Sequence, residues 1–351
     1  MTSYSARFRF HLVALILAAL TPAVIAETLY VDGNIGNDLY PGSKEKPLKT
    51  LTQVALMVNR PTGPGPTTVK IGPGLYSLTR CVVFENTRPY TEQNRLVIEA
   101  AVLPDDPNWT PALMPVILSA EDPREPNKPN RSTETYSLKI KVSYVTIRGL
   151  RFLGNPLVNN WHCCIERTGR NLDDLLVTQC MFLGQPGAMD IYCAALATGD
   201  RFVLDHNIFY NCNACAVFWD GPQSVAGKAC AMRYCIIDGA SAAGVWTCRT
   251  KDDFEFHHNI VTRSEYFWMR RSGDQIKYQL QDCAVTNNKY FSGYGVETGP
   301  IGQTGSEVSF QQKNVVKYGN VTLIKDKTAK NFLHVAPKGV GSELGAGLFA
   351  K

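Results

Sequence analysis

The sequence predicts an all-β fold, a right-handed parallel β-helix with a short capping helix at its N-terminal end. The first observation is a ten-residue pattern that recurs seven times, with starts 24 to 30 residues apart. The second is its periodicity, because the first, third and eighth positions of each string are apolar, as in a strand, a break and a second strand. The third is that the repeats show no helical period. Repeats of this length, built only from short strands, stack as the coils of a solenoid. The strings are VTIRGLRFLG from 145, LLVTQCMFLG from 175, FVLDHNIFYN from 202, CAMRYCIIDG from 230, FEFHHNIVTR from 254, CAVTNNKYFS from 283 and VSFQQKNVVK from 308.

The sixth position of the strings falls at the break between the two strands. It reads Leu, Cys, Asn, Cys, Asn, Asn and Lys along the chain, with asparagine at Asn207, Asn259 and Asn288. Asparagine tolerates the left-handed backbone conformation and hydrogen-bonds to nearby backbone groups. We therefore expect a ladder of side chains along one corner of the stack.

The N-terminal residues are typical of a secretory signal. Arg7 and Arg9 precede the apolar run LVALILAALTPAVI, and small residues stand before Glu27. This predicts a signal peptide over 1–26 and a secreted protein, periplasmic or extracellular. No later apolar run is long enough to cross a bilayer, so we expect no membrane insertion.

The elements that precede the repeats cover the open end of the solenoid and begin its coils. Thr50 followed by Gln53 has the form of a capping box, and apolar residues at helical spacing follow, which predicts a short amphipathic helix over 51–59. Coils then begin near 67–77, 95–102 and 115–119. With the repeats, they predict a single parallel β-helix domain over 27–351.

Charge and cysteine usage exclude some function classes. The sequence has 36 basic and 31 acidic residues, and without the signal the balance is 34 to 31, which is too weak to indicate nucleic-acid binding. The 11 cysteines are odd in number and match no disulfide framework, so core packing is the default. Cys212 and Cys215 form a lone C-x-x-C, which does not predict zinc. We expect a monomer with no metal.

Two segments resemble a known group of exported proteins. YVDGNIGNDLYPGSKEKPLKTLTQV at 30–54 and IGPGLYS at 71–77 are similar to the opening of the pectate-lyase-like superfamily of parallel β-helix proteins. The resemblance implies the same fold over nearly the whole mature chain. Members of that superfamily include lyases, hydrolases, esterases, epimerases and non-catalytic glycan binders, so the fold alone does not choose among them.

A third strand is expected in each coil after the ten-residue string. Its apolar anchors are Ile165, Ile191, Val217, Val245, Phe267 and Val296. If these point inward, strict alternation turns the following residues outward. That outward column reads Glu166, Tyr192, Phe218, Trp246, Trp268 and Glu297. In the same way Tyr266 and Arg270 face outward, while Phe267 and Met269 face the core.

Exposed aromatic rings beside charges indicate a surface on which a sugar chain stacks. We therefore expect Tyr192, Phe218, Trp246, Trp268 and Tyr266 to bind substrate. The alternative is a shift of one residue, which would place all these rings in the core.

Cations gather near the end of the expected third strand. Arg249 and Lys251 follow the strand of Trp246, and the next coil brings Arg270 and Arg271 about 4.8 Å away. β-Elimination beside a uronate carboxylate needs that carboxylate neutralised as the enolate forms, and it needs a base whose pKa neighbouring cations have lowered. Such a patch fits a polysaccharide lyase acting on an acidic polysaccharide.

Here the sequence is similar to the chondroitinase B and alginate lyase family. A lysine, a downstream ladder asparagine and an Arg-x-Gly appear in order as Lys251, Asn259 and Arg271-Ser-Gly273. The resemblance implies Lys251 as catalytic base and Arg271 or Arg270 as neutraliser or acid. The family also holds calcium with acidic residues on the strand before its lysine. Gly244 and Trp246 stand on that strand here, so no cofactor is predicted. A second departure from the family is an insertion at 274–282, after the Arg-x-Gly.

Three further interpretations stay open. A non-catalytic glycan-binding or surface protein would keep the aromatic column without chemistry. A glycoside hydrolase could use the carboxylates of Asp190 and Asp220. Histidines at ladder turns are usually structural, and His257 is the best of them for a helper base because it follows Lys251 closely.

Overall fold

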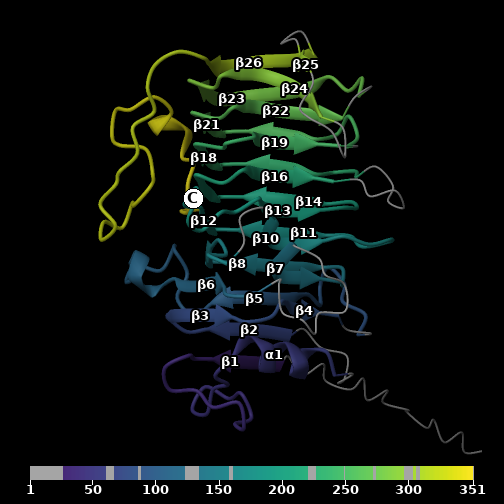
Figure 1. Ribbon diagram of the computed structural model, residues 1–351, viewed down its shortest axis with the longest axis vertical. Coiled ribbons are helices and arrows are strands. Elements are labelled where there is room, and N and C mark those ends of the chain that lie inside the picture. Colours follow the sequence, from purple (N-terminus) through teal and green to yellow (C-terminus); the bar gives the residue numbers. More distant parts are fainter. Residues whose placement is uncertain are drawn as a thin grey trace, which may run out of the picture.

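The computed structural model shows a right-handed parallel β-helix whose coils stack along one long axis (Figure 1). The structure describes residues 27–60, 67–85, 88–122, 134–157, 161–219, 227–248, 250–271, 274–295, 303–305 and 309–350. The expected signal peptide lies outside them. Among the described residues, no helix combines the length and apolar character needed to span a membrane.

Strand pairing divides the solenoid into three faces. Nearly every strand pairs in parallel with the equivalent strand one coil away. The first face consists of β1 (Glu27–Val31), β2 (Thr67–Ile71), β5 (Leu96–Ala100), β8 (Val145–Arg148), β11 (Leu175–Thr178), β14 (Phe202–Asp205), β17 (Ala231–Arg233), β20 (Glu255–His257), the start of β23 (Tyr278–Thr286) and β26 (Phe310–Val316).

The second and third faces complete each coil. The second face consists of β3 (Gly74–Leu78), β6 (Pro115–Ser119), β9 (Arg151–Leu153), β12 (Met181–Leu183), β15 (Ile208–Tyr210), β18 (Ile236–Asp238), β21 (Ile260–Thr262) and the end of β23. The third face consists of β4 (Val82–Phe84), β7 (Glu134–Ile140), β10 (Trp161–Arg167), β13 (Cys193–Ala197), β16 (Ala214–Phe218), β19 (Ala243–Thr247), β22 (Tyr266–Arg271), β24 (Tyr290–Gly295) and the antiparallel β25 (Gln303–Gly305).

The corner between the first and second faces is the expected ladder. Asn207 accepts a hydrogen bond from the Cys180 amide at 2.9 Å and donates to the Val177 carbonyl at 2.8 Å, and Asn259 repeats both bonds two coils later. The residue before each ladder position is left-handed, which turns the chain from one strand into the next. These residues are Gln179, His206, Tyr234, His258 and Asp282, with φ between 50° and 55°.

The strands of the first five repeats pair in the predicted register, but the last two predicted strings are out of register. Ile260 pairs with Ala284 and Tyr278 with Phe310, so the equivalent strings begin at 278 and 310, not at 283 and 308. The end of the expected insertion 274–282 is the start of β23, which continues from the first face into the second. The apolar residues of CAVTNNKYFS also match the repeat pattern, although the string begins five residues after the true repeat. This match displaced the predicted strings from the observed register.

The interior is packed by residues that repeat from coil to coil. Phe152, Phe182 and Phe209 form a stack with ring centroids 5.1 and 4.8 Å apart. All 11 cysteines lie among the described residues, all are free thiols, and all but Cys81 are buried. Most of them therefore serve as small apolar residues, as the sequence indicated.

Helix α1 (Leu51–Val58) lies at the N-terminal end, where it contacts β1 and β4 (Figure 1). The Thr50 hydroxyl accepts a hydrogen bond from the Gln53 amide at 3.1 Å and so begins the helix. Its buried side chains join the main core, so the expected cap is present. The described residues also include the short 3₁₀ helices Pro111–Leu113 and Ser342–Leu344.

The C-terminal segment turns back along the outside of the second face. In Figure 1 it is the yellow chain that descends from β26 until its end lies near β12 and β18. Its buried side chains pack on the outward residues of the second face. The side chains it contributes are Leu323, Phe332, Leu333 and Leu348.

Candidate functional site

The strands of the third face contain a bend that breaks alternation. In β22 both Phe267 and Trp268 belong to the main core, while Tyr266 and Met269 pack on the outer side. The cross-strand pairing skips the same position in the neighbouring strands, so the bend repeats from coil to coil. The skipped residues are Cys164, Ala194, Cys215, Gly244 and Phe267.

The bend corrects the predicted positions of two aromatic residues. Trp268 is 0% exposed and its indole donates to the Thr247 hydroxyl at 2.8 Å, so it is a core residue. Phe218 is also buried, with its ring centroid 4.8 Å from that of Phe202. A strict period of two could not place them, because each third-face strand turns two successive residues inward.

Arg270 also points inward, contrary to the prediction. It is 1% exposed, and its Nε lies 3.3 Å from the Asp274 carboxylate. Its Nη2 donates to the carbonyl oxygens of Asp274 and Ile276 at 3.0 and 2.7 Å. The guanidinium therefore anchors the loop after β22 and does not reach a ligand on the outer surface.

Tyr192 and Trp246 do lie on the outer side, where they line a pocket of about 220 Å³. Tyr192 stacks on Trp161 with centroids 4.0 Å apart, and Trp219 meets Trp246 edge to face at 6.0 Å. The remaining lining residues are Tyr136, Cys163, Glu166, Thr168, Cys193, Leu196 and Val217.

The polar groups of this pocket are few. Glu166 is buried in it and accepts a hydrogen bond from the Thr168 hydroxyl. Lys139 stands at its edge, with Nζ 3.6 Å from the centroid of the Tyr136 ring. Burial raises the pKa of the Tyr192 phenol and raises the pKa of the Cys163 thiol well above its ordinary value. Both groups are therefore neutral near pH 7 and act as hydrogen-bonding or apolar surface.

Sequence reasoning missed three pocket rings, those of Tyr136, Trp161 and Trp219. Trp219 follows β16 immediately, and Trp161 begins β10. The sequence feature that could have indicated these rings is tryptophan content, because three of the five tryptophans lie within residues 161–246, near the expected third strands.

Tyr266 lies on the outer side beyond this pocket. It stacks on Tyr290 with centroids 4.8 Å apart and packs with Ala243 and Met269, with Trp246 beside the same cluster. The ring of Tyr266 is buried, so a ligand on this surface would meet the partly exposed Tyr290 rather than Tyr266.

The proposed cations do not form one cluster. Lys251 is exposed on the turn after β19, where its amide donates to the Gly227 carbonyl at 2.9 Å. Arg271 is half-buried at the end of β22, at the same corner of the solenoid one coil later. Arg249 lies outside the described residues. With Arg270 in the core, the described members of the patch are Lys251 and Arg271.

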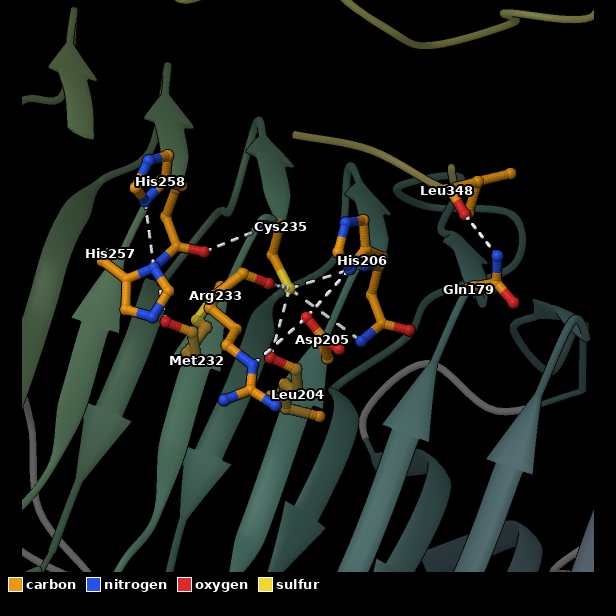
Figure 2. Close-up of polar contacts among 12 residues, drawn as sticks. Gln179, Leu204, Asp205, His206, Met232, Arg233, Cys235, His257, His258 and Leu348 are labelled. Atoms are coloured by element: carbon orange, nitrogen blue, oxygen red, sulfur yellow. Dashed lines mark hydrogen bonds and ion pairs between the residues drawn. The ribbon is translucent and has the colours of Figure 1, made fainter. Parts of the chain in front are cut away.

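His257 lies on a different face from the pocket, which corrects its expected place beside the substrate. It belongs to β20 of the first face, and Figure 2 shows it against His258, with Arg233 and Asp205 nearby. Its Nδ1 is 3.0 Å from Nδ1 of His258. Burial, His258 and Arg233 lower the pKa of His257.

The structure describes only one of the two carboxylates considered for hydrolysis. Asp190 lies on the turn before β13, and Asp220 lies outside the described residues. Among the residues that the structure describes, no group of three or more His, Cys, Asp or Glu side chains could hold a metal ion.

Comparison with known proteins gives structural likeness only. No family model and no curated protein matches the sequence. A rhamnogalacturonan lyase is 11% identical, with a TM-score of 0.45, over 92% of this chain and 100% of its own. The GH136 lacto-N-biosidase of Eubacterium ramulus is 10% identical, with a TM-score of 0.45, over 83% and 65%. The pectin methylesterase of Aspergillus niger is 10% identical, with a TM-score of 0.39, over 91% and 94%. At such identities, any activity must be argued from the residues of this chain.

Proposed function

We propose that this protein binds a polysaccharide chain on the outer side of its third face, with the aromatic pocket as the principal sugar site. The observation that carries the proposal is an aromatic-lined pocket on the outer side of a parallel sheet, with the rings of Tyr192, Trp219 and Trp246 in its walls. The expected signal peptide over 1–26 would place this binding outside the cytoplasm.

The chemistry of the pocket suits a sugar ring. Flat aromatic faces pack against the C–H groups of a sugar, while Glu166 and Thr168 supply the few polar groups that fix its orientation. A volume of about 220 Å³ is below the roughly 300 to 1,000 Å³ typical of sites that enclose a drug-sized ligand. The pocket therefore fits one unit of a longer chain, with the neighbouring units on the surface around it.

The second candidate is a polysaccharide lyase that cleaves an acidic polysaccharide. Its support is that Lys251 is exposed and Arg271 is half-buried at one corner of adjacent coils. Lys251 would remove the proton and Arg271 would neutralise the uronate carboxylate. Because Arg270 is committed to Asp274, this candidate has one guanidinium where two were expected.

Hydrolysis by the described carboxylates has less support. Glu166 pairs with Leu196, and Asp190 lies six residues earlier in the same coil. Glu166 lines the first pocket, whereas Asp190 stands on the turn before β13 and lines a different pocket. Inverting hydrolysis needs two carboxylates about 6.5 to 9.5 Å apart that flank the same bond.

Tryptophan fluorescence tests the binding proposal, because Trp161, Trp219 and Trp246 line the pocket while Trp109 and Trp268 are buried elsewhere. We expect a polysaccharide from a panel of neutral and uronate chains to quench the emission, and Trp246→Ala to weaken binding tenfold or more. The control is Tyr318→Ala, which removes an aromatic ring that is 86% exposed and outside the pocket. Equal loss in both variants, or no quenching by any chain, contradicts the proposal.

The same panel decides the lyase candidate. Ultraviolet absorbance from unsaturated sugar ends, lost in Lys251→Ala and kept in the exposed-lysine control Lys44→Ala, would establish β-elimination. Binding without such absorbance leaves the protein as a non-catalytic binder.

A further inference from the structure

A second pocket adjoins the first and shares one wall with it. It has a volume of about 450 Å³ and lies at the turns that lead from the second face into the third. Tyr192 lines both pockets, so its ring stands between them. The other lining residues are Pro186, Gly187, Asp190, Ile191, Asn211, Asn213 and Ser241.

The lining of the second pocket is rich in unused hydrogen-bonding groups. One carboxylate oxygen of Asp190 accepts from the Gly187 amide at 2.9 Å, which leaves the other oxygen available. Asn213 donates its amide to the Ser241 hydroxyl at 3.0 Å, which leaves its carbonyl oxygen available. The side chain of Asn211 makes no hydrogen bond to another described residue. Carboxylate and amide groups of this kind pair well with sugar hydroxyl groups.

The backbone that carries these groups is fixed before any ligand arrives. The Asn211 amide donates to the Asp238 carbonyl at 2.9 Å, and the Asn213 amide donates to the Ile191 carbonyl at 2.8 Å. These bonds join successive coils of the stack. Binding therefore orders few groups, which lowers its entropic cost.

The charge of the two pockets indicates the class of sugar. Each contains one carboxylate, Glu166 in the first and Asp190 in the second, and among the described lining residues neither contains Lys, Arg or His. The cation at the edge, Lys139, lies over the Tyr136 ring. A uronate unit would bring a third negative charge toward these carboxylates, and that repulsion weakens its binding.

We propose that the two pockets are adjacent subsites for successive units of a neutral polysaccharide. One unit stacks in the aromatic pocket, Tyr192 separates the two units, and the next unit is held through its hydroxyl groups by Asp190, Asn211 and Asn213. This inference rests on the proposed function, and it selects a neutral chain over the acidic substrate of the lyase candidate.

The test uses neutral oligosaccharides of one to four units, namely β-1,4-linked glucose and xylose series, with tryptophan quenching as the readout. We expect affinity to rise at least tenfold from one unit to the length that fills both pockets. Asp190→Ala with Asn213→Ala abolishes that rise and leaves the affinity for a single unit unchanged. The control Asp252→Ala removes an exposed carboxylate on the turn before β20 and keeps the rise.

Charge is tested with oligogalacturonides of the same lengths. We expect them to bind at least tenfold more weakly than the neutral series, and Asp190→Asn to strengthen their binding severalfold. Asp190→Asn keeps an acceptor for the Gly187 amide, so it serves if the alanine variant fails to fold.

The outcomes separate the two proposals. Single units that bind without any gain from length, or a gain that survives the double variant, overturn the second subsite and leave the polysaccharide-binding proposal intact. Tighter binding of oligogalacturonides overturns the choice of a neutral chain. Absence of quenching by every oligosaccharide and polysaccharide overturns the proposed function and this inference with it.

Discussion

The outer sides of the second and third faces both carry apolar residues, yet among the described residues only the second is covered by another segment of the chain. On the second face the outward column from β12 to β21 is buried beneath the C-terminal segment. On the third face, Tyr192, Trp219 and Trp246 remain half-exposed around a pocket. Uncovered apolar surface on a stable fold is typical of a binding site. The second face therefore contributes to stability, and the difference supports the proposal that the third face contacts another molecule.

The cover is attached by polar bonds as well as by packing. Gln179 donates to the Leu348 carbonyl at 2.8 Å (Figure 2). The Gly347 amide donates to the Tyr234 carbonyl at 2.9 Å, so the segment is held to the corner ladder at two points. The Leu348 amide donates to Nε2 of His334 at 2.9 Å. The segment is therefore a fixed part of the fold.

The largest expected effect comes from the covered column. Ile236 is 0% exposed beneath the C-terminal segment, so Ile236→Ala should lower the free energy of unfolding by about 2 to 5 kcal/mol. Leu75 belongs to the same outward column, beyond the end of the cover, and is 60% exposed. Leu75→Ala should change stability by no more than about 0.5 kcal/mol. Guanidinium denaturation measures both, and equal shifts would mean that the cover does not stabilise the column.

The next effect is a pH dependence of the cover. Burial lowers the pKa of His334 from 6.5 to about 4. Its ring accepts a hydrogen bond from the Leu348 amide and stacks on Phe349 with centroids 4.6 Å apart. Between these pH values the unfolded chain binds a proton that the folded chain does not. Stability from this group is therefore complete above pH 6.5 and falls as the pH drops toward 4, by at most about 3 kcal/mol.

Denaturant midpoints at pH 7 and pH 4.5 measure that dependence. His334→Gln should flatten the pH profile relative to the wild-type protein. His257→Gln, which alters a half-buried histidine on the first face, should flatten it less. An unchanged profile in His334→Gln would assign the acid sensitivity elsewhere, with His162 the next group, since burial lowers its pKa to about 4 as well.

The fold could be predicted from the sequence because its cause is local and repeated. Each coil places apolar residues at the same points, and the asparagine ladder reports the corner directly, as Asn207 and Asn259 show. Capping-box chemistry at Thr50 likewise located the helix to within one residue. These features depend on neighbours in sequence, or on the next copy of the same pattern.

The candidate site could be predicted only in part, because its geometry depends on the bend. Phe267 and Trp268 both point inward, so every later residue of the strand faces the side opposite to the one predicted. No single residue type marks this bend in every coil, so the sequence does not reveal it. Arg270 is buried for a second reason, since its partner Asp274 lies in the segment that was expected to be an insertion. Trp246 and Tyr192 kept their expected side, so the aromatic surface was predicted while its exact members were not.

The smallest expected effect sharpens the comparison most. Trp246 is half-buried on the uncovered face, so Trp246→Ala should cost only about 1 kcal/mol of unfolding free energy, roughly the partial burial of one side chain. The same variant should lose most of its polysaccharide binding, whereas Ile236→Ala should keep binding once folded. Denaturation measures the loss of stability in each variant, and fluorescence titration measures the loss of polysaccharide affinity. If Trp246→Ala destabilises the protein as much as Ile236→Ala does, the third face is a structural surface like the second, because its rings would then be held for packing and not for a ligand.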